Sequence, residues 1–206
     1  MNEFEKGLLK YLSLEQLARI QNAKIGIAGA GGLGSNCSQM LVRSGFKKIK
    51  IIDFDVVDYS NLNRQFYFNN QVGRYKVEVL RENLLGINPD ARIENLIITL
   101  NETNAPNLFK DCDVVVEAFD RIECKKLIIE TYMSSDKFLI AASGLAGWGD
   151  SNRIHAHKIK DNFYVVGDLV TGIGPDSPPM APCVQIAAGK QADLVLSFVL
   201  GSLKEA

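Results

Sequence analysis

Apolar residues recur at different spacings along the chain, and the spacing changes from one segment to the next. Between residues 4 and 21 they lie three or four positions apart, the period of an amphipathic helix: Phe4, Leu8, Leu9, Leu12, Leu17 and Ile20. Ser13 and Gln16 have the spacing of a capping box, so a second helix is expected to begin there. We therefore expect a helical segment over residues 1–22, followed by a single domain over 23–206.

Short apolar runs and helix-period segments alternate after residue 22. Strands are expected at 24–30, 48–55, 91–100, 113–119 and 138–147, and helices from the glycine-rich segment to about Ser44, at 71–87 and at 121–134. The strands are almost continuously apolar, as in sheets that are covered on both faces. This order predicts an α/β fold, a Rossmann-like and mostly parallel sheet with helices on both faces.

The pattern changes after Gly147. Two alternating segments, 153–159 and 163–167, flank a short polar turn and predict a C-terminal antiparallel hairpin at the edge of the sheet. His155 and His157 alternate along the first of them, where a solvated strand face is a simpler explanation than a metal site with only two ligands. A Gly/Pro-rich loop over 167–183 and a last helix over roughly 184–201 complete the order.

Composition narrows the function classes. The 206 residues are 47% hydrophobic and 23% charged, which is enough for a real core, and the net charge of −1 gives no case for nucleic acid or an anionic membrane. The N-terminal segment carries acidic residues where the apolar part of a signal peptide would lie, and the apolar run near the C-terminus is expected to be too short to span a membrane. Without a CxxC pair, no zinc site of usual spacing is expected, and Cys37, Cys112 and Cys124 are interpreted as small core residues of a cytoplasmic, reduced protein.

A glycine-rich segment after the first strand is the first sign of chemistry. Gly29, Gly31, Gly32 and Gly34 fit the pattern G-x-G-x-x-G, which brings a backbone turn and a helix N-terminus close to a phosphate. Asp53 lies 19 residues beyond Gly34 at the end of the second strand, where an acid that binds ribose is expected. At this point NAD and ATP fit equally well.

The polar stretch that follows the second strand favours ATP. Asn61, Arg64, Gln65 and Lys76 offer more donors than a dinucleotide needs and suit a triphosphate. A triphosphate brings Mg²⁺, which asks for a carboxylate, and Asp120 follows the strand at 113–119 on the ligand-binding edge. Asp55, Asp58 and Ser60 are expected to cap turns.

The segments "GAGGLG", "DFDVVDYSNLNRQF", "VGRYKVE" and "AFD" together resemble the ThiF/MoeB/HesA family, prokaryotic relatives of ubiquitin-activating enzymes. The resemblance covers about residues 24–145 and continues in "MAPCVQIAAG". It implies an adenylyltransferase that uses ATP and Mg²⁺ to activate the C-terminal glycine of a small ubiquitin-fold sulfur carrier ending in Gly-Gly, with release of pyrophosphate. The short, zinc-free chain is most similar to ThiF-type proteins of thiamine biosynthesis, which also implies a homodimer.

The resemblance assigns a role to each matching position. The four glycines would approach the phosphates, Asp53 would hold the ribose, and Asp120 would hold Mg²⁺. Phosphate oxygens would be bound by Asn61, Arg64, Gln65 and Lys76. Some members of the family use a loop cysteine to link to the carrier, which makes Cys183 a candidate, but other members have an apolar residue in the segment that matches "MAPC", which favours packing. Trp148 and the loop 167–183 are candidates for contact with the carrier.

The N-terminal segment departs from the family pattern. Relatives carry an arginine-rich segment before the first strand that reaches the partner subunit's phosphates, whereas Arg19 is the only arginine here and lies in an expected packed helix. This leaves open a binding module that has lost turnover. Activation of a molybdopterin-type or other carrier stays open as well, as does an NAD(P)-dependent oxidoreductase, although the sequence shows no nicotinamide pocket.

Overall fold

The computed structural model describes residues 1–203. Seven strands form one sheet in the order β3-β2-β1-β4-β5-β7-β6. In chain order they are β1 Lys24–Ala28, β2 Lys48–Asp53, β3 Arg92–Ile97, β4 Val114–Glu117, β5 Phe138–Ala142, β6 His155–Lys160 and β7 Phe163–Gly167. All neighbouring pairs are parallel except β6 and β7, which form an antiparallel hairpin at one edge. The predicted α/β architecture and its hairpin are thus confirmed.

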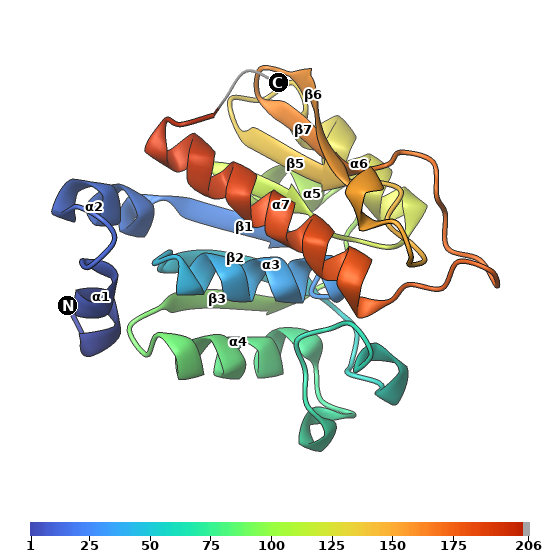
Figure 1. The fold of residues 1–206 in the computed structure, drawn as a ribbon, viewed down its shortest axis with the longest axis horizontal. Coiled ribbons are helices and arrows are strands. Elements are labelled where there is room, and N and C mark those ends of the chain that lie inside the picture. The colour runs from blue at the N-terminus through green and yellow to red at the C-terminus, as the bar shows by residue number, and fades with distance from the viewer. Residues whose placement is uncertain (204–206) are drawn as a thin grey trace.

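Helices cover both faces of the sheet (Figure 1). One face carries α3 Gly32–Arg43, α4 Lys76–Ile87 and α7 Ala181–Leu200, and the other carries α5 Ala105–Leu108 and α6 Ile122–Tyr132. Along β2, Ile51 faces the first core and Ile52 the second, as the alternation of a strand requires. Phe109 packs so closely on β1 that a side chain at Gly26 would lie 2.4 Å from its ring, so this layer depends on glycine there.

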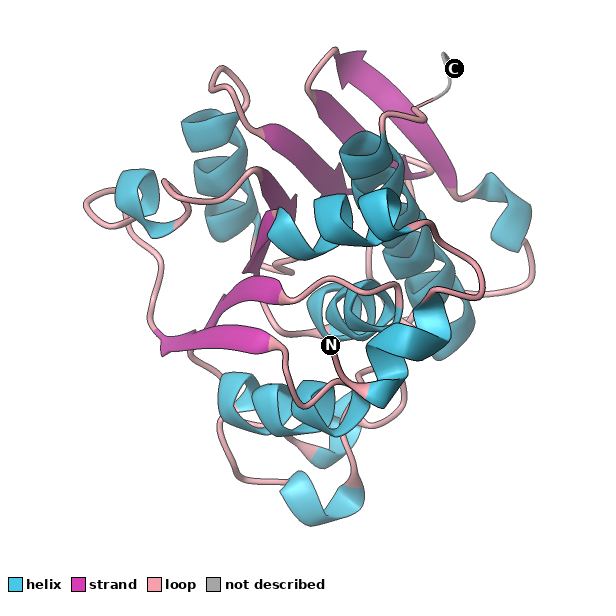
Figure 2. Cartoon of the chain, turned by 90° about the vertical axis from the view of Figure 1, so that its left-hand side faces the viewer, coloured by secondary structure: helices cyan, strands magenta, loops and turns pink. Residues whose placement is uncertain are grey.

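The N-terminal segment forms two short helices, α1 Glu3–Leu8 and α2 Leu14–Asn22 (Figure 2). The capping box predicted at Ser13 is present, with the hydroxyl accepting from the Gln16 backbone at 3.1 Å. The buried Glu5 carboxylate pairs with Lys47 at 2.7 Å and ties α1 to the amino ends of the strands.

Several boundaries differ from expectation, and three of the differences have a clear local cause. The helix expected at 71–87 begins at Lys76, since residues 69–71 form a 3-10 turn and Gly73 has φ +86°. The last helix begins earlier than expected, at Ala181, because Pro182 fits the first turn, where a backbone N–H has no helical partner. The fifth strand ends at Ala142, before the left-handed Gly144. The short α5 was not predicted.

α7 corrects the expectation that no segment is long enough to span a membrane. Its 20 residues are long and apolar enough to cross a membrane, and 44% of its most apolar part is buried inside the protein. Within the described residues it is the one helix that passes this test of length and composition, which a core helix of a globular protein also passes. α7 packs along α3 across the front of the sheet (Figure 1).

Candidate functional site

Polar side chains gather at the carboxyl ends of the central strands. β1 runs to α3 and β2 on one side, while β4 lies on its other side, so the chain reverses its direction of winding between β1 and β4. Ligands of open α/β sheets bind at this switch point. The loop between β2 and α4 and the loop before α7 both project from this end (Figure 1).

The glycine loop depends on its glycines at two positions. Gly29 has φ +108°, and a Cβ there would lie 2.8 Å from the carbonyl oxygen of Ala118 after β4. A Cβ on Gly34 would lie 1.8 Å from the carbonyl oxygen of Gly29. The loop is therefore folded back against the first turn of α3, whose backbone N–H groups have no side-chain cap at Gly31. Such a helix start is suited to bind phosphate.

Asp53 lies beneath this loop and holds it. Its carboxylate accepts the Ala30 N–H at 2.7 Å and the Asp55 N–H at 2.8 Å. Burial raises the pKa of Asp53, and these two backbone donors oppose the shift. The predicted ribose ligand is thus also a structural clamp between β2 and the glycine loop.

Arg64 and Gln65 lie against the glycine loop, as a phosphate-binding role requires. The Arg64 Cγ lies 3.6 Å from the Cβ position of Gly32, and Gln65 Nε2 lies 3.9 Å from that of Gly31. Asn36 of α3 donates to the carbonyl oxygens of both Gly32 and Arg64, at 2.7 and 2.8 Å. Among the described residues, the buried Oε1 of Gln65 has no hydrogen-bond partner. The structure therefore brings these two predicted residues to the loop, where the Gln65 amide nitrogen can donate to a phosphate and its oxygen can accept only from a hydroxyl or amine of a ligand.

The other predicted phosphate ligands already have protein partners. The Lys76 ammonium, at the start of α4, pairs with Asp55 at 2.9 Å, so Asp55 neutralises a cation and is not simply a turn cap. Asn61 accepts the Asp58 N–H at 3.1 Å, while Asp58 accepts the Ser60 N–H at 2.8 Å, which confirms the expected cap at Asp58. Any phosphate contact by Lys76 has to be shared with Asp55.

Asp120 lies exposed in the turn after β4. Burial lowers the pKa of Arg64, and the negative charge of Asp120 opposes the shift, so the two side chains lie within electrostatic reach across the site. Among residues 1–203, no three His, Cys, Asp or Glu side chains are grouped to hold a metal. This donor set still fits Mg²⁺, which binds through one or two carboxylates together with substrate phosphates and water.

Three of the four thiols are buried, whereas Cys124 on α6, which was expected in the core, is only partly buried. Cys183 is the third residue of α7 and only 1% exposed, with Arg153 Nη2 3.9 Å from its sulfur. Burial raises the pKa of both Cys37 and Cys112 to about 12, as for inert core thiols. Trp148, by contrast, is 65% exposed.

Arg19, the one arginine before β1, lies at the end of α7 that points away from the site of its own chain. Its Nη2 lies 3.5 Å from the Cβ position of Gly201, the C-cap of α7. Val184, near the other end of α7, touches Gly32 of the glycine loop. The length of α7, about 1.5 Å per residue, separates Arg19 from the site.

Sequence reasoning missed two charged groups behind the site. Glu117 ends β4 fully buried against Lys125, and Asp168 begins the loop before α7 in an ion pair with Arg153. An acid at the end of an apolar strand was the available signal for Glu117. Lys125, eight residues later on α6, pairs with Glu117 and could have supported that signal.

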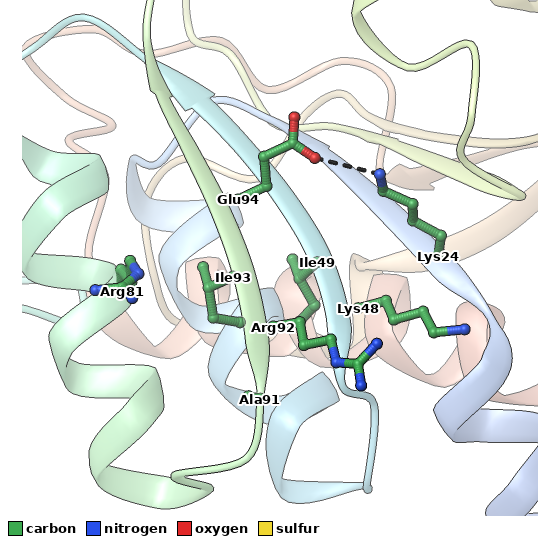
Figure 3. Close-up of a pocket in the computed structure, with 8 residues that line it drawn as sticks. All are labelled: Lys24, Lys48, Ile49, Arg81, Ala91, Arg92, Ile93 and Glu94. Carbon is green, nitrogen blue, oxygen red and sulfur yellow. Dashed lines mark hydrogen bonds and ion pairs between the residues drawn. The ribbon is translucent and has the colours of Figure 1, made fainter.

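An open depression lies at the opposite, amino ends of β1, β2 and β3 (Figure 3). Lys24, Lys48 and Arg92 stand side by side there in the strand register, and Lys24 pairs with Glu94. Lys24 and Lys50 also pair with Asp111. These contacts link strand starts to a loop, far from the glycine loop, and are interpreted as structural.

Comparison with known proteins places this geometry in a family. The model of the ThiF family matches residues 6–205. The adenylyltransferase and sulfurtransferase UBA4 of Candida glabrata is 32% identical over 189 residues, covering 89% of this chain and 44% of UBA4. The probable adenylyltransferase/sulfurtransferase MoeZ of Mycobacterium tuberculosis is 35% identical over 192 residues, covering 91% and 47%. The chain thus spans a little under half the length of these relatives.

Solved structures share the fold. The E. coli tRNA N6-threonylcarbamoyladenosine dehydratase TcdA, in complex with AMP, superposes with a TM-score of 0.86 at 20% identity, covering 95% of this chain and 93% of that one. E. coli MccB with ATP gives 0.72 at 23% identity, covering 92% and 60%. At these identities the likeness establishes the fold alone.

Proposed function

Because the chain belongs to the ThiF family, we propose that it is an ATP-dependent adenylyltransferase acting on the C-terminal glycine carboxylate of a small ubiquitin-fold sulfur carrier that ends in Gly-Gly. One observation carries the proposal: Arg64 and Gln65 lie on the glycine loop, with Asp120 within electrostatic reach of Arg64. Arg64 and the Gln65 amide nitrogen thus lie beside a helix N-terminus suited to bind phosphate, and Asp120 adds an exposed carboxylate after β4. UBA4 is named an adenylyltransferase and sulfurtransferase, and MoeZ a probable one, which supports adenylylation as the reaction.

The reaction needs positioning and charge more than proton transfer. An oxygen of the carrier's carboxylate, already ionised at neutral pH, forms a bond to the α-phosphorus of ATP. The bond from that phosphorus to the bridging oxygen breaks, and pyrophosphate leaves with the electron pair. Negative charge grows on the phosphate oxygens, where the α3 N-terminus, Arg64 and Lys76 would stabilise it. Asp120 would hold Mg²⁺, which supplies further charge neutralisation when bound.

The identity of the carrier is the finer part of the proposal. On the family resemblance alone, the proposed carrier is of the thiamine type, with a molybdopterin-type carrier as the alternative. SUMO-activating enzyme subunit 2 of Dictyostelium, 34% identical over 155 residues, supports a ubiquitin-like partner in general, although this chain covers only 22% of it. A homodimer is proposed on the family resemblance alone, and an NAD(P)-dependent activity gains no support from the family match.

Carrier-dependent ATP–pyrophosphate exchange tests the proposal. We expect exchange that requires a carrier with an intact Gly-Gly end and that is lost in Asp120→Ala. Asp136→Ala is the matched control, because its side chain is 94% exposed on the loop before β5 and lies away from the site. ATP binding without exchange, for every carrier tried, would select the binding module instead. ATP–pyrophosphate exchange that is stimulated by tRNA and not by a carrier would instead indicate a tRNA substrate, as the name of TcdA describes.

A further inference from the structure

Glu117 is a carboxylate in the interior of the protein with no part in the reaction described above. It is the last residue of β4, pairs with Ala28 in the strand register and is 0% exposed. Burial raises its pKa, and the Lys125 ammonium opposes the shift. A buried charge of this kind is costly unless it is paired and hydrogen-bonded, so its contacts show what it holds in place.

Every contact of this pair ends at the carboxyl edge of the sheet. Glu117 accepts the Phe119 N–H at 2.8 Å through one oxygen and the Lys125 ammonium at 2.5 Å through the other. Lys125 also donates to the carbonyl oxygen of Ala142 at the end of β5, at 2.9 Å. Gln191 of α7 donates to the Glu117 carbonyl oxygen at 3.1 Å. Four elements, β4, β5, α6 and α7, therefore meet at one ion pair.

The segment fixed in this way is the turn 118–121. Its Ala118 carbonyl oxygen lies 2.8 Å, and its Phe119 ring 3.1 Å, from the Cβ position of Gly29. The next residue is Asp120, whose charge reaches Arg64 across the site. A small rotation of this turn would move the Asp120 carboxylate together with the Ala118 and Phe119 atoms that pack against Gly29.

We propose that Glu117 and Lys125 are positioning residues, which orient the Asp120 carboxylate toward Mg²⁺ and the phosphates by fixing the turn 118–121 against Gly29. This inference rests on the proposed function for the ligand, but the fixed turn is a property of the protein alone. Residues that orient a metal ligand typically change metal affinity by about 10–100-fold when removed.

The first test needs no nucleotide. In Lys125→Met, we expect the backbone amide of Phe119 to exchange its hydrogen roughly tenfold faster, while amides of α3 keep their wild-type rates. Lys126→Met is the matched control, because it removes the neighbouring lysine of α6, whose side chain is 69% exposed and only weakly paired with Glu130. Unchanged exchange at Phe119, or equal acceleration throughout the domain, would overturn the inference.

The second test measures Mg²⁺-dependent ATP binding by calorimetry in a double-mutant cycle with Asp120→Asn. If Lys125 acts through Asp120, Lys125→Met alone raises the Mg²⁺ concentration for half-saturation roughly tenfold. In a protein that already carries Asp120→Asn, the same substitution causes no further rise. Independent, multiplicative effects would contradict the inference.

Two further outcomes are distinguishable. If the wild-type protein binds Mg²⁺–ATP but shows no ATP–pyrophosphate exchange with any carrier, the proposed function is refuted. The double-mutant cycle on Mg²⁺–ATP binding remains valid. If the wild-type protein binds no nucleotide, the hydrogen exchange of the Phe119 amide alone decides whether Lys125 fixes the turn. Should Lys125→Met fail to fold, Glu117→Gln/Lys125→Met leaves no unpaired buried charge, and the same measurements decide.

Discussion

The Arg64 guanidinium combines a charge with a fixed plane. Its Nη1 donates to the Ser60 carbonyl oxygen at 3.1 Å and to Asn63 Oδ1 at 2.7 Å, while the aliphatic Cγ and Cδ lie 3.6 and 3.8 Å from the Cβ position of Gly32. Arg64→Lys keeps the charge but loses the planar fork that can make these contacts and a phosphate contact together. We expect ATP affinity to fall about tenfold, the value of one charge-assisted hydrogen bond, as measured by calorimetry.

Arg74→Lys is the control for this change. Arg74 belongs to the same loop but is 46% exposed and pairs with Glu82 on the surface. We expect its ATP affinity to equal that of the wild type. Equal affinities for Arg64→Lys and the wild type would show that only the charge of Arg64 is used.

Cys183 offers a second prediction at the residue scale. Its thiol is 1% exposed and lies 3.9 Å from Arg153 Nη2, so a carrier reaches it only if the surrounding side chains move. We expect Cys183→Ala to keep exchange within about twofold of the wild type while losing about 1 kcal/mol of stability to a small cavity. A tenfold loss of exchange with unchanged ATP binding would place the thiol in the adenylylation step.

The residue types of the site were readable from sequence, but their partners were not. Arg64, Gln65 and Asp120 were predicted from charge and position; the structure places Arg64 and Gln65 beside the glycine loop and Asp120 exposed in the turn after β4, and their roles stay predictions. The pairing of Lys76 with Asp55 depends on how the loop 55–75 folds back, which no spacing encodes. Local sequence signals identify donors, whereas long-range folding decides which of them remain free.

At the scale of elements, the loop between β7 and α7 is anchored by one carboxylate. Asp168 accepts the N–H groups of Val170 and Thr171 at 2.8 and 2.7 Å and the Thr171 hydroxyl at 2.5 Å, and it pairs with Arg153. Burial would raise the pKa of Asp168, but the bonds from Thr171, Val170 and Arg153 outweigh it and lower the pKa below the ordinary value. Leu169, between the anchors, is held at φ +66°.

The lowered pKa of Asp168 fixes the sign of a pH dependence. A depressed pKa in the folded state gives stability that is present above the unfolded value, about 3.9, and is lost as the pH falls below it toward the folded pKa. Asp168→Asn removes this contribution. We expect it to cost about 2 kcal/mol in the free energy of unfolding at pH 7 and to flatten the loss of stability between about pH 5 and pH 3.

Urea unfolding across this pH range measures both effects. Limited proteolysis at pH 7 supplies a local readout, because Val170 is 86% exposed and should become more susceptible when its anchor is removed. Asp136→Asn, on an exposed loop, serves as the control. A variant whose stability runs parallel to the wild type at every pH would show that Asp168 contributes no titrating stabilisation.

Element types were predicted more securely than their ends. Continuous apolar runs identified β1, β2, β4 and β5, and alternation identified the β6–β7 hairpin. The start of α4 was placed early because residues 71–75 continue the helical pattern, yet the backbone there pairs with residues 55–57 instead. α5, with only four residues, is too short to show a period.

At the scale of the whole molecule, charge is divided between the two ends of the sheet. The carboxyl end holds the candidate site, where Arg64 and Asp120 face solvent and the unpartnered oxygen of Gln65 lies buried. The amino end holds a closed network in which Lys50, 9% exposed, donates to the Leu108 carbonyl oxygen and pairs with Asp111. Hydrogen bonds from Lys24 and Lys50 keep the pKa of Asp111 well below its usual range. Polar groups without a protein partner thus lie at the first end, whereas the charged groups of the second end pair with one another.

This division predicts that stability and ligand response can be separated. Mg²⁺–ATP at 100 times its dissociation constant should add about 2.7 kcal/mol to the free energy of unfolding and raise Tm by about 5–10 °C. Lys50→Met leaves part of the amino-end charge uncompensated and should lower the basal Tm by several degrees, for a loss of about 1–3 kcal/mol. Because the strands keep the two ends apart, the shift on adding Mg²⁺–ATP should stay at its wild-type size.

Arg64→Ala should give the converse result in the same thermal scan, a near-wild-type basal Tm and a much smaller shift with Mg²⁺–ATP. Since each variant is scanned with and without nucleotide, the four Tm values separate basal stability from binding for each end of the sheet. A reduced nucleotide shift in Lys50→Met would mean that the amino-end network is coupled to the site, and the depression at that end would then need a functional explanation. Independent responses would instead show that the ion pairs among Lys24, Lys50, Glu94 and Asp111 serve the fold alone.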